Sequence, residues 1–463
     1  MASAPIHIPG TLKKVAKVFS DASFQCWLVG GAIRDGLLGR KSYDYDLATD
    51  AAPKEVIKLF RRTIPTGIRH GTVSILLGRY QFQTTSFRRE ESYSDGRHPD
   101  KVSFSGNIDS DLARRDFTVN AMAWDLINSK FFDPHRGRDD LDKRLLRAIG
   151  NPEERFQEDG LRSIRACRFA SQLGFHIHQA TLNAIGRARS NIEGLSAERI
   201  WEEIKKILQT EKPSVSFLMF KKTGLIEMLF PEFNIQSASS LREHEETDFL
   251  ISLRACDLAN PANFSLRAAA LFHRLGHSAH PTKSEDSSFL RSAGMARLIL
   301  KRYRAPNAEN SRIISMLSNL CFQYSNNWSD AKVRRFVSRI GVGQIHDLIE
   351  LKNVTIRANL SFSGFPHKYP KEGPGNRIPI SESARQLQDL NERVNSVIEL
   401  KVPLAIGDLA IDGNQIMDNC RVRSGPKLGE LLKFLLESVL ENPKKNSSDQ
   451  LLWLSRSWLS KHP

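Results

Sequence analysis

The sequence contains few cysteines and no apolar segment long enough to cross a membrane. Its five cysteines are scattered over 463 residues and none belongs to a Cys-x-x-Cys pair: Cys26, Cys167, Cys256, Cys321 and Cys420. This spacing argues against a disulfide framework and a structural zinc site, and it indicates a reducing compartment. No window approaches the roughly 18 consecutive apolar residues of a transmembrane helix. Residues 1–10 also lack the apolar core of a secretory signal, so we expect a cytoplasmic protein without a membrane partner.

Acidic residues are fewer than basic ones, and no repeat of fixed period is present. Lys and Arg total 67 against 52 for Asp and Glu, which gives a formal charge of +15. Such an excess attracts polyanions, nucleic acid foremost, although a basic protein without such a partner remains the alternative. The length predicts about three or four domains or subdomains.

Strand signals are confined to the N-terminal third and nearly vanish after residue 153. The patterns predict helices over residues 12–19 and 53–60, and a hairpin over residues 71–87 with its turn at Gly78-Arg79. Residues 88–99 are polar and lack an apolar period, so we expect an exposed, mobile loop. A helix is expected over residues 111–123, linkers over 276–288 and 359–381, and an amphipathic helix over 428–440.

The most informative stretch, residues 28–49, joins an apolar run to Gly30-Gly31, Arg34-Asp35 and finally Asp44 and Asp46. A Gly-Gly turn before a helix offers bare backbone N–H groups to a polyphosphate. On a strand, Asp44 and Asp46 lie roughly 7 Å apart on one face, so their carboxylates can share a pair of hard cations suited to phosphoryl transfer. The alternative is a strand with two exposed aspartates. The glycines and Arg-Asp pair upstream favour phosphate chemistry.

Two further clusters carry arginines. Arg114-Arg115-Asp116 suits a triphosphate, with Asp116 holding one arginine by a charge-assisted pair, unless the triplet is only a solvated helix start.

In the second cluster, Asp159, Arg162, Arg165 and Arg168 recur every three residues and would form one stripe on a helix. An Asp beside an Arg can read the amino group and acceptor of cytosine or adenine. A salt-bridged surface helix is the alternative.

Taken together, these stretches resemble the tRNA nucleotidyltransferase/poly(A) polymerase family, in the class II branch of the polymerase-β-like superfamily. The order and spacing of the motifs fit from about residue 25 to residue 210. Residues 408–416 and 425–432 resemble bacterial members, and residues 215–400 match loosely. The matching segments are LVGGAIRD with DYD from Leu28 to Asp46, RRDFTVNA from Arg114, DPHRGRDDL from Asp133, EDGLR from Glu158 and RFASQLGF from Arg168.

The resemblance implies an α+β protein: a polymerase-β-like nucleotidyltransferase head, a mixed sheet with helices, followed by an all-α neck, body and tail. The implied parts are a catalytic head over residues 1–149, a nucleotide-selecting neck over 150–212, a helical body over 213–355 and a tRNA-binding tail over 356–463. The implied activity is template-independent addition of CCA to tRNA 3′ ends from CTP and ATP, with release of pyrophosphate.

The resemblance also implies roles for single residues. Asp44 and Asp46 would be catalytic and hold two Mg²⁺ ions. The nucleotide-binding residues would comprise a triphosphate set and a base-reading set. These are Gly30, Gly31, Arg34, Arg115 and Asp116 for the first, and Asp159, Arg162, Arg165 and Arg168 for the second.

Three positions depart from the family pattern. Gln83 stands where many members have an acid, and Gly160 replaces a proline before the template arginine. Arg274 replaces the Asp of a His-Asp signature in a helix that ends near His277, so we expect a structural helix without phosphohydrolase activity.

An A-adding tRNA nucleotidyltransferase and a bacterial poly(A) polymerase remain alternatives, as does a catalytically silent RNA-binding protein. The compact loop at residues 88–99 favours a CCA-adding enzyme over the polymerase and over a CC-adding enzyme.

Overall fold

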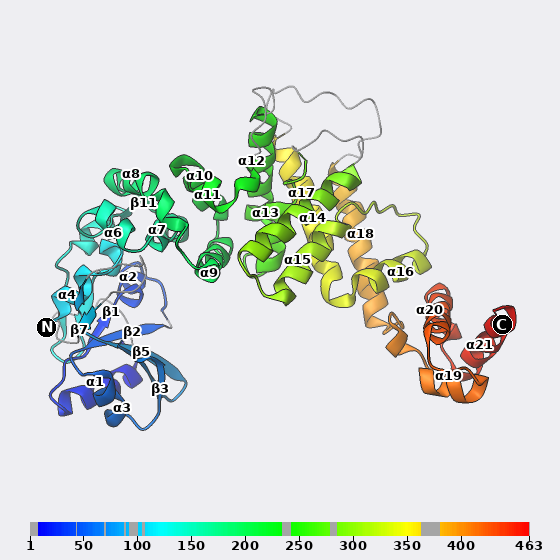
Figure 1. The fold of residues 1–463 in the computed structure, drawn as a ribbon, viewed down its shortest axis with the longest axis horizontal. Helices are drawn as coiled ribbons and strands as arrows, with labels where there is room; N and C mark the ends of the chain where they lie inside the picture. Colours follow the sequence, from blue (N-terminus) through cyan, green and yellow to red (C-terminus); the bar gives the residue numbers. More distant parts are fainter. Residues whose placement is uncertain are drawn as a thin grey trace. The chain divides into compact units, whose positions relative to one another are not determined.

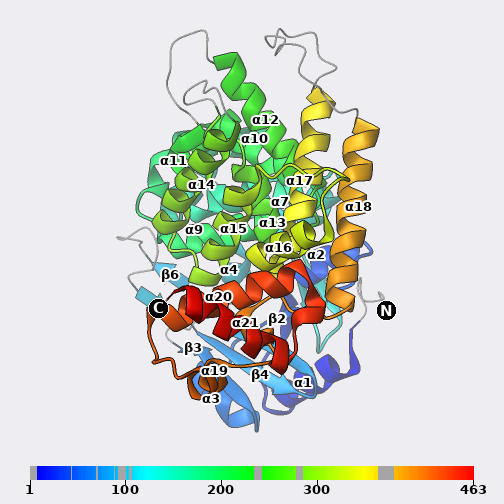
Figure 2. The same cartoon turned by 90° about the vertical axis from the view of Figure 1, so that its right-hand side faces the viewer.

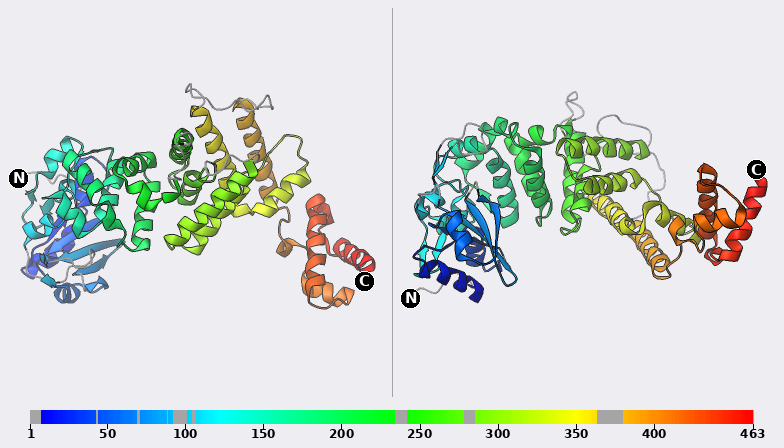
Figure 3. Two further views of the ribbon diagram at one scale, coloured as in Figure 1. Left: turned by 45° about the horizontal axis from the view of Figure 1, so that its top comes forward. Right: turned by 60° about the horizontal axis from the view of Figure 1, so that its bottom comes forward.

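The computed structural model describes residues 8–42, 44–68, 71–87, 89–91, 101–103, 107–233, 242–277, 285–362 and 380–462. The chain divides into two compact units, Met1–Asn234 and Ile235–Pro463, and each is described by itself. In Figure 1 the sheet belongs to the first unit, and the second unit is drawn as helices from green to red. The further views in Figure 3 show the same contrast between the units.

The first unit is built on a seven-stranded mixed sheet with strand order β3-β4-β5-β2-β1-β8-β9. Strand β2 pairs in parallel with β5 and antiparallel with β1, so it lies centrally beside the strand that precedes the Gly-Gly turn. The strands are β1 Trp27–Val29, β2 Tyr45–Thr49, β3 Thr63–Gly67, β4 Thr72–Leu77, β5 Tyr80–Ser86, β8 Ala123–Asp125 and β9 Lys130–Phe132.

Apolar side chains at helical spacing pack α1 Gly10–Asp21 into the same core as the sheet. Leu12, Val15 and Phe19 are fully buried there. Helix α3 Pro53–Leu59 begins with proline at its first turn, where the missing N–H costs no hydrogen bond. The predicted helices over 12–19 and 53–60 are confirmed, and so is the hairpin, because β4 and β5 pair antiparallel.

The helix predicted over residues 111–123 is wrong. Helix α4 Ile108–Ala113 ends early, the 3₁₀ turn η2 Thr118–Asn120 follows, and the chain then enters β8. The Asp116 side chain accepts a hydrogen bond from the Phe117 N–H at 2.9 Å, which competes with helical backbone bonding. Phe117 also forms an isolated bridge with Ala148. Consecutive apolar residues in this segment are buried, so their order in the sequence does not distinguish a helix from the irregular chain that is observed.

The loop predicted over residues 88–99 contains a strand at its start. β6 Arg89–Glu91 pairs antiparallel with β7 Lys101–Ser103. This backbone ladder joins segments ten residues apart, and periodicity over three residues does not reveal it. The rest of the loop, residues 92–99, and Arg88 lie outside the described residues.

A helical layer completes the first unit. Helix α7 packs against α9 and α10, and the short strands β10 Leu145–Leu146 and β11 His176–Ile177 pair in parallel beside it. The other elements are α2 Gly31–Leu37, α5 Gly137–Asp142, α6 Pro152–Glu158, α7 Leu161–Leu173, α8 Gln179–Arg187, η3 Arg189–Ile192, α9 Ala197–Leu208, α10 Pro213–Thr223, α11 Leu225–Leu229 and η4 Pro231–Phe233.

The described part of the second unit is helical throughout. Figure 2 shows α19, α20 and α21 near its C-terminal end, where they share one apolar core. Helices α16, α17 and α18 build another core around Phe336 and Leu390. The helices are α12 Arg242–Leu258, α13 Phe264–Phe272, α14 Glu285–Arg302, α15 Asn307–Asn319, α16 Asp330–Ile340, α17 Val342–Phe362, α18 Ile380–Glu399, η5 Ile406–Asp408, α19 Gly413–Cys420, α20 Pro426–Glu441, η6 Pro443–Lys445 and α21 Ser448–Lys461.

The two predicted linkers are shorter than expected in the described part of the chain. Helix α14 begins at Glu285 and α17 continues to Phe362, while residues 278–284 and 363–379 lie outside the described residues. The amphipathic helix predicted over residues 428–440 is confirmed as α20. Among the described residues, no helix is long and apolar enough to span a membrane.

The segment that resembles a His-Asp signature follows α13. His273 is buried, and its Nδ1 lies 2.7 Å from the Ala270 carbonyl oxygen. Arg274 forms an ion pair with Asp248 and donates to the Asn359 side chain. Burial, followed by the charge of Arg274, lowers the pKa of His273 well below its ordinary value. A guanidinium therefore occupies the position after this histidine and pairs with Asp248.

Candidate active site

Gly30 directly follows strand β1 and has a backbone conformation that favours glycine. Its φ is +76°, and a Cβ atom there would lie 2.8 Å from Nη1 of Arg115. Helix α2 begins at the next residue, Gly31. The guanidinium of Arg115 therefore lies directly against the Gly-Gly turn, and any larger residue at position 30 would have to displace it.

The two predicted catalytic aspartates lie at the start of β2. Asp46 pairs in register with Val29 on β1 and Gln83 on β5, and exposed Asp44 directly precedes the strand. Burial raises the pKa of Asp46, the nearby charge of Asp44 raises it further, and Arg115 opposes both. Two carboxylates thus stand close enough to repel each other.

This charge arrangement fits a divalent cation. A cation would relieve the repulsion between Asp44 and Asp46, and hard cations prefer carboxylate oxygens. Gln83 places a neutral amide at the neighbouring position of the sheet. Among the described residues, no group of three or more His, Cys, Asp or Glu side chains forms a metal site, so the aspartate pair would share any metal with substrate and water.

Arg34 lies on α2 and its side chain is 5% exposed. Its Nε donates to Asp35 Oδ1 at 2.8 Å, and its Nη1 donates to Asn120 Oδ1 at 2.6 Å. The guanidinium carbon also lies 5.3 Å from the ring centroid of Phe169 on α7. These contacts hold the guanidinium in one orientation beside the Gly-Gly turn.

The acid that holds the arginine pair is Asp111. Its carboxylate is fully buried and accepts from Arg114 Nε at 3.0 Å and from Arg115 Nη2 at 3.2 Å. Burial alone would raise the pKa of Asp111, but the two guanidinium groups outweigh it and lower that pKa. The prediction that Asp116 holds one of these arginines is wrong, because the chain leaves α4 after Ala113 and turns Asp116 in another direction.

Asp116 instead binds helix α7. Its Oδ2 accepts from Arg165 Nη2 at 2.6 Å and Nε at 2.9 Å, and its Oδ1 accepts from Asn120 Nδ2 at 3.0 Å. Burial favours the protonated form, but Arg165, Asn120 and the Phe117 N–H together lower the pKa of Asp116. A continuous chain of hydrogen bonds therefore links Arg34, Asn120, Asp116 and Arg165.

Asp159 and Arg162 have separate partners. Asp159 precedes α7, where its Oδ1 accepts from the Leu161 N–H at 3.0 Å and its Oδ2 accepts from Arg199 Nη2 at 2.9 Å. Arg162 donates from Nη1 to Glu158 Oε2 at 2.6 Å. The Arg162 N–H donates to the Asp159 carbonyl oxygen at 3.0 Å, but the described contacts do not join the two side chains, and a different neighbour orients each of them.

The remaining two arginines of the stripe surround Phe169. Arg168 Nε donates to Glu203 Oε2 at 2.6 Å, and its guanidinium carbon lies 4.1 Å from the Phe169 ring centroid. Arg165 lies 5.3 Å from the same centroid. Burial would raise the pKa of Glu203, but Arg168, Arg165 and Lys206 lower it. Asp116, which lies between α4 and η2, and Glu203 on α9 pair with these arginines, in place of the surface salt bridges of the alternative interpretation.

Gly160 has a steric reason to be glycine in this chain. A Cβ at Gly160 would lie 2.7 Å from the backbone oxygen of Asn191. The φ of −57° is one that proline adopts, so the close approach of Asn191, not backbone conformation, accounts for the departure from the family pattern.

Sequence reasoning missed the partners that orient the predicted residues. These are Asp111, Asn120, Phe169, Arg199 and Glu203. The sequence pattern could have indicated two of these partners, Arg199 and Glu203. Arg199 and Glu203 are four residues apart on a strongly amphipathic helix, and Glu203 stands at a buried position of its apolar face. A buried acid on such a face requires a cation as its partner.

Comparisons with known proteins show which family this chain resembles. Residues 26–147 match the poly A polymerase head domain, and residues 174–236 match a probable RNA and SrmB-binding site of polymerase A. A CCA-adding enzyme of Lactobacillus delbrueckii subsp. bulgaricus is 32% identical over 434 residues, 94% of each chain. A CCA-adding enzyme of Enterococcus faecalis is 30% identical over 457 residues, 98% of each chain.

Solved structures share the fold. The CCA-adding enzyme of Bacillus stearothermophilus in complex with CTP has a TM-score of 0.69 at 24% identity and covers 100% of this chain and 99% of its own. The CCA-adding enzyme of Thermotoga maritima complexed with tRNA has a TM-score of 0.54 at 19% identity and covers 98% and 96%. The predicted α+β fold is confirmed. With about 30% identity to full-length relatives, the chain belongs to the CCA-adding enzymes of the tRNA nucleotidyltransferase/poly(A) polymerase family.

Proposed function

We propose that this chain adds cytidine, cytidine and adenosine in turn to the 3′ end of tRNA, from CTP and ATP. Each transfer forms a bond from the primer 3′-oxygen to the α-phosphorus and breaks the α–β phosphoanhydride, releasing pyrophosphate. One observation carries the proposal: Asp44 and Asp46 lie within mutual repulsion, and Arg115 lies both near them and against the Gly-Gly turn. This combination suits metal-dependent transfer from a triphosphate.

Asp44 and Asp46 would hold Mg²⁺, since their neighbouring carboxylates are hard ligands that repel each other. When bound, the metal supplies Lewis-acid stabilisation of charge on the attacking and leaving oxygens. Arg115 and Arg34 orient the triphosphate through guanidinium groups already fixed by Asp111, Asp35 and Asn120. Gly30 and Gly31 bring the backbone close to it without a side chain.

Base selection belongs to Asp159 and Arg162. Asp159 accepts from the exocyclic amino group of cytosine or adenine, and Arg162 donates to the neighbouring acceptor. Arg199 and Glu158 fix the directions of these two side chains. Arg165 and Arg168 support α7 through Asp116, Glu203 and the Phe169 ring.

The positions of the site residues also assign a role to each part of the chain. Residues 1–149 form the catalytic head and residues 150–212 the nucleotide-selecting neck, since the transfer and template residues lie there. Residues 213–355 form the body and 356–463 the tRNA-binding tail. The net charge of +15 supports backbone contacts with tRNA, and the absence of paired cysteines supports a cytoplasmic location.

The test is purified protein with Mg²⁺, CTP and ATP on tRNAs that end at the discriminator base, at C and at CC. Growth of all three to CCA supports the proposal. Extension of only the CC-ended tRNA identifies an A-adding enzyme, and long A tails on unrelated RNA identify a poly(A) polymerase.

Two variants complete the test. Asp46→Asn should abolish every transfer while tRNA binding persists, whereas the exposed control Asp142→Asn should retain activity. A fully active Asp46→Asn variant would refute the metal assignment, and an inactive wild type that binds tRNA would favour a silent RNA-binding protein.

A further inference from the structure

The side-chain amide of Asn120 joins two charged groups of opposite sign. Its Oδ1 accepts from Arg34 Nη1 at 2.6 Å, and its Nδ2 donates to Asp116 Oδ1 at 3.0 Å. Asn120 is 6% exposed and belongs to the turn η2. Since a guanidinium offers no acceptor and an ionised carboxylate no donor, only one orientation of the amide satisfies both neighbours. Both ends of this amide are therefore specified by charge.

The two neighbours of Asn120 belong to different parts of the site. Arg34 lies against the Gly-Gly turn, since a Cβ at Gly31 would lie 3.5 Å from its Nη2. Asp116 accepts from Arg165 on α7 at 2.6 and 2.9 Å. Among the described contacts, no hydrogen bond joins Arg34 directly to Arg165. The amide and the carboxylate together form the polar connection between the proposed triphosphate site and the helix that carries the base-reading set.

The ring of Phe169 makes a second, apolar connection between the same two arginines. The guanidinium carbons of Arg34 and Arg165 each lie 5.3 Å from its centroid. This distance is within the roughly 6 Å reach of cation–π attraction. Hydrogen bonds depend steeply on angle. The amide of Asn120, more than the ring, therefore sets the direction of the Arg34 guanidinium.

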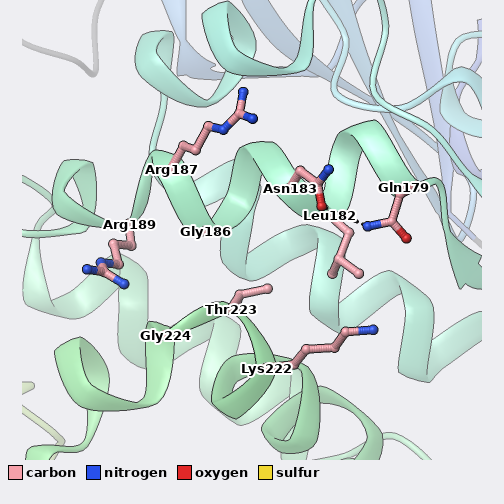
Figure 4. A pocket seen from close by; sticks show the side chains of 9 residues that line it. All are labelled: Gln179, Leu182, Asn183, Gly186, Arg187, Arg189, Lys222, Thr223 and Gly224. Carbon is pink, nitrogen blue, oxygen red and sulfur yellow. Dashed lines mark hydrogen bonds between the residues drawn. The ribbon is translucent and has the colours of Figure 1, made fainter.

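This connection runs through packed side chains. Arg34, Asn120 and Asp116 are all buried, and hydrogen bonds to charged groups are stronger in such surroundings than in water. The pocket in Figure 4, lined by residues of α8 and the end of α10, contains none of these side chains. Removing the amide would leave two buried charges each short of one hydrogen bond.

We propose that Asn120 is a positioning residue that makes the orientation of Arg34 depend on the position of α7. The proposal rests on the proposed function, in which Arg34 binds triphosphate and α7 carries the base-reading set. It deepens that function, because triphosphate binding and base selection are then linked. Arg34 is held in its direction by an amide that Asp116 orients, and Arg165 in turn holds Asp116.

The main test measures the binding of inorganic tripolyphosphate, which has the phosphates of the substrate but no base, by calorimetry at a fixed Mg²⁺ concentration. Asn120→Ala should raise the Kd roughly tenfold, the effect of one hydrogen bond to a charged group. The matched control is Asn128→Ala. Asn128 is an exposed amide in the same unit that also donates to a carboxylate, Asp125 Oδ2 at 2.8 Å. Its loss should leave the Kd within about twofold of wild type.

Arg165→Lys tests the link itself, because it keeps the charge on α7 but not the paired donors to Asp116. In the wild-type background this variant should raise the tripolyphosphate Kd roughly threefold, although Arg165 lies on the far side of Asp116 from Arg34. In the Asn120→Ala background the same substitution should change the Kd by less than about 1.5-fold, since the connection is already broken.

Equal effects of Arg165→Lys in both backgrounds would overturn the proposal, because a merely structural role, or direct contact of Arg165 with the phosphates, predicts additivity. An Asn120→Ala variant that binds as tightly as the Asn128→Ala control would overturn it too. If Asn120→Ala does not fold, Asn120→Ser takes its place, since a single hydroxyl cannot occupy both positions of the amide. Nucleotide addition to tRNA is scored separately: an enzyme that adds only A rejects the proposed function, while the link measured with tripolyphosphate stands.

Discussion

At the scale of single residues, Asp111 holds the arginine pair that adjacency in the sequence assigns to Asp116. Asp116 follows two arginines directly, yet it binds Arg165, which is 49 residues away. Asp111 holds Arg114 and Arg115 from inside α4. Arg115 is thereby fixed between a buried carboxylate and the Gly-Gly turn, where its charge lowers the pKa of Asp46. The guanidinium is therefore held in position before substrate arrives.

The Asp116–Arg165 pair should make stability depend on pH in a defined direction. The pKa of folded Asp116 is below its ordinary value of 3.8. The stability from its ionised form is therefore fully present above the unfolded pKa and is lost as the pH falls toward the folded pKa. We expect Asp116→Asn to cost about 3 kcal/mol at pH 7 and progressively less below about pH 4.

Urea unfolding of wild type and Asp116→Asn at intervals from pH 7 to pH 3 measures this difference. Asp142→Asn, at an exposed position, should leave the unfolding free energy unchanged within about 0.5 kcal/mol. A difference that stays constant over the whole pH range would contradict the ion pair.

Arg162 provides a second prediction at this scale. Its Nη1 donates to Glu158 and its Nη2 donates to the Arg114 carbonyl oxygen at 3.0 Å. Arg162→Ala should reduce the preference for CTP and ATP over UTP and GTP by about 1–3 kcal/mol, roughly 5- to 150-fold, since the proposed base-reading contact is lost. The KM for triphosphate should change much less.

Single-turnover incorporation of each of the four nucleotides on tRNA ending in C and in CC measures this selectivity. Arg138→Ala, an exposed arginine on α5, is the control. Unchanged selectivity in Arg162→Ala would remove this residue from the template.

At the scale of elements, the start of α7 depends on a close contact with the turn at Asn191. Gly160→Ala adds a Cβ that would lie 2.7 Å from the Asn191 backbone oxygen. Its φ of −57° suits alanine, so reduced chain entropy would stabilise the variant slightly, but the clash with backbone dominates. We expect a net loss of about 2 kcal/mol of unfolding free energy.

Gly194→Ala is the matched control, because a Cβ there meets no atom within 4 Å. Urea unfolding should show this variant within about 0.5 kcal/mol of wild type. Equal stability of the two variants would show that the Asn191 turn yields, and that glycine at position 160 has no steric cause.

At the scale of the whole molecule, the metal should be needed for chemistry but not for folding. In the described part of the chain, no cluster of three or more metal-ligating side chains exists, and Arg274 forms an ion pair with Asp248. Removing divalent metal with EDTA should therefore abolish nucleotide transfer while shifting the midpoint of thermal unfolding by less than about 2 °C.

Transfer assays and circular dichroism melts before and after chelation measure the two effects, and added Mg²⁺ should restore transfer. A large drop in the melting temperature would reveal a structural metal site and contradict the structural role of the Arg274–Asp248 pair.

Local pattern predicted much of the fold. Helices α1 and α3, the β4–β5 hairpin and α20 are confirmed, because the periods of strands and helices appear in consecutive residues. The helix over residues 111–123 is wrong, because Phe117, Val119 and Met122 are buried on every side and carry no period. The short ribbon of β6 and β7 is a pairing between separate segments, which a local pattern does not show.

The sequence by itself determined the family and the chemical groups, since the Gly-Gly turn, the aspartate pair and the arginine stripe are local motifs in a specific order. Only the tertiary structure decided which charges pair: Asp116 with Arg165, Asp159 with Arg199 and Glu203 with Arg168. The partners in these pairs lie 49, 40 and 35 residues apart. An ion pair needs two groups within about 4 Å, and over such separations packing alone sets that distance.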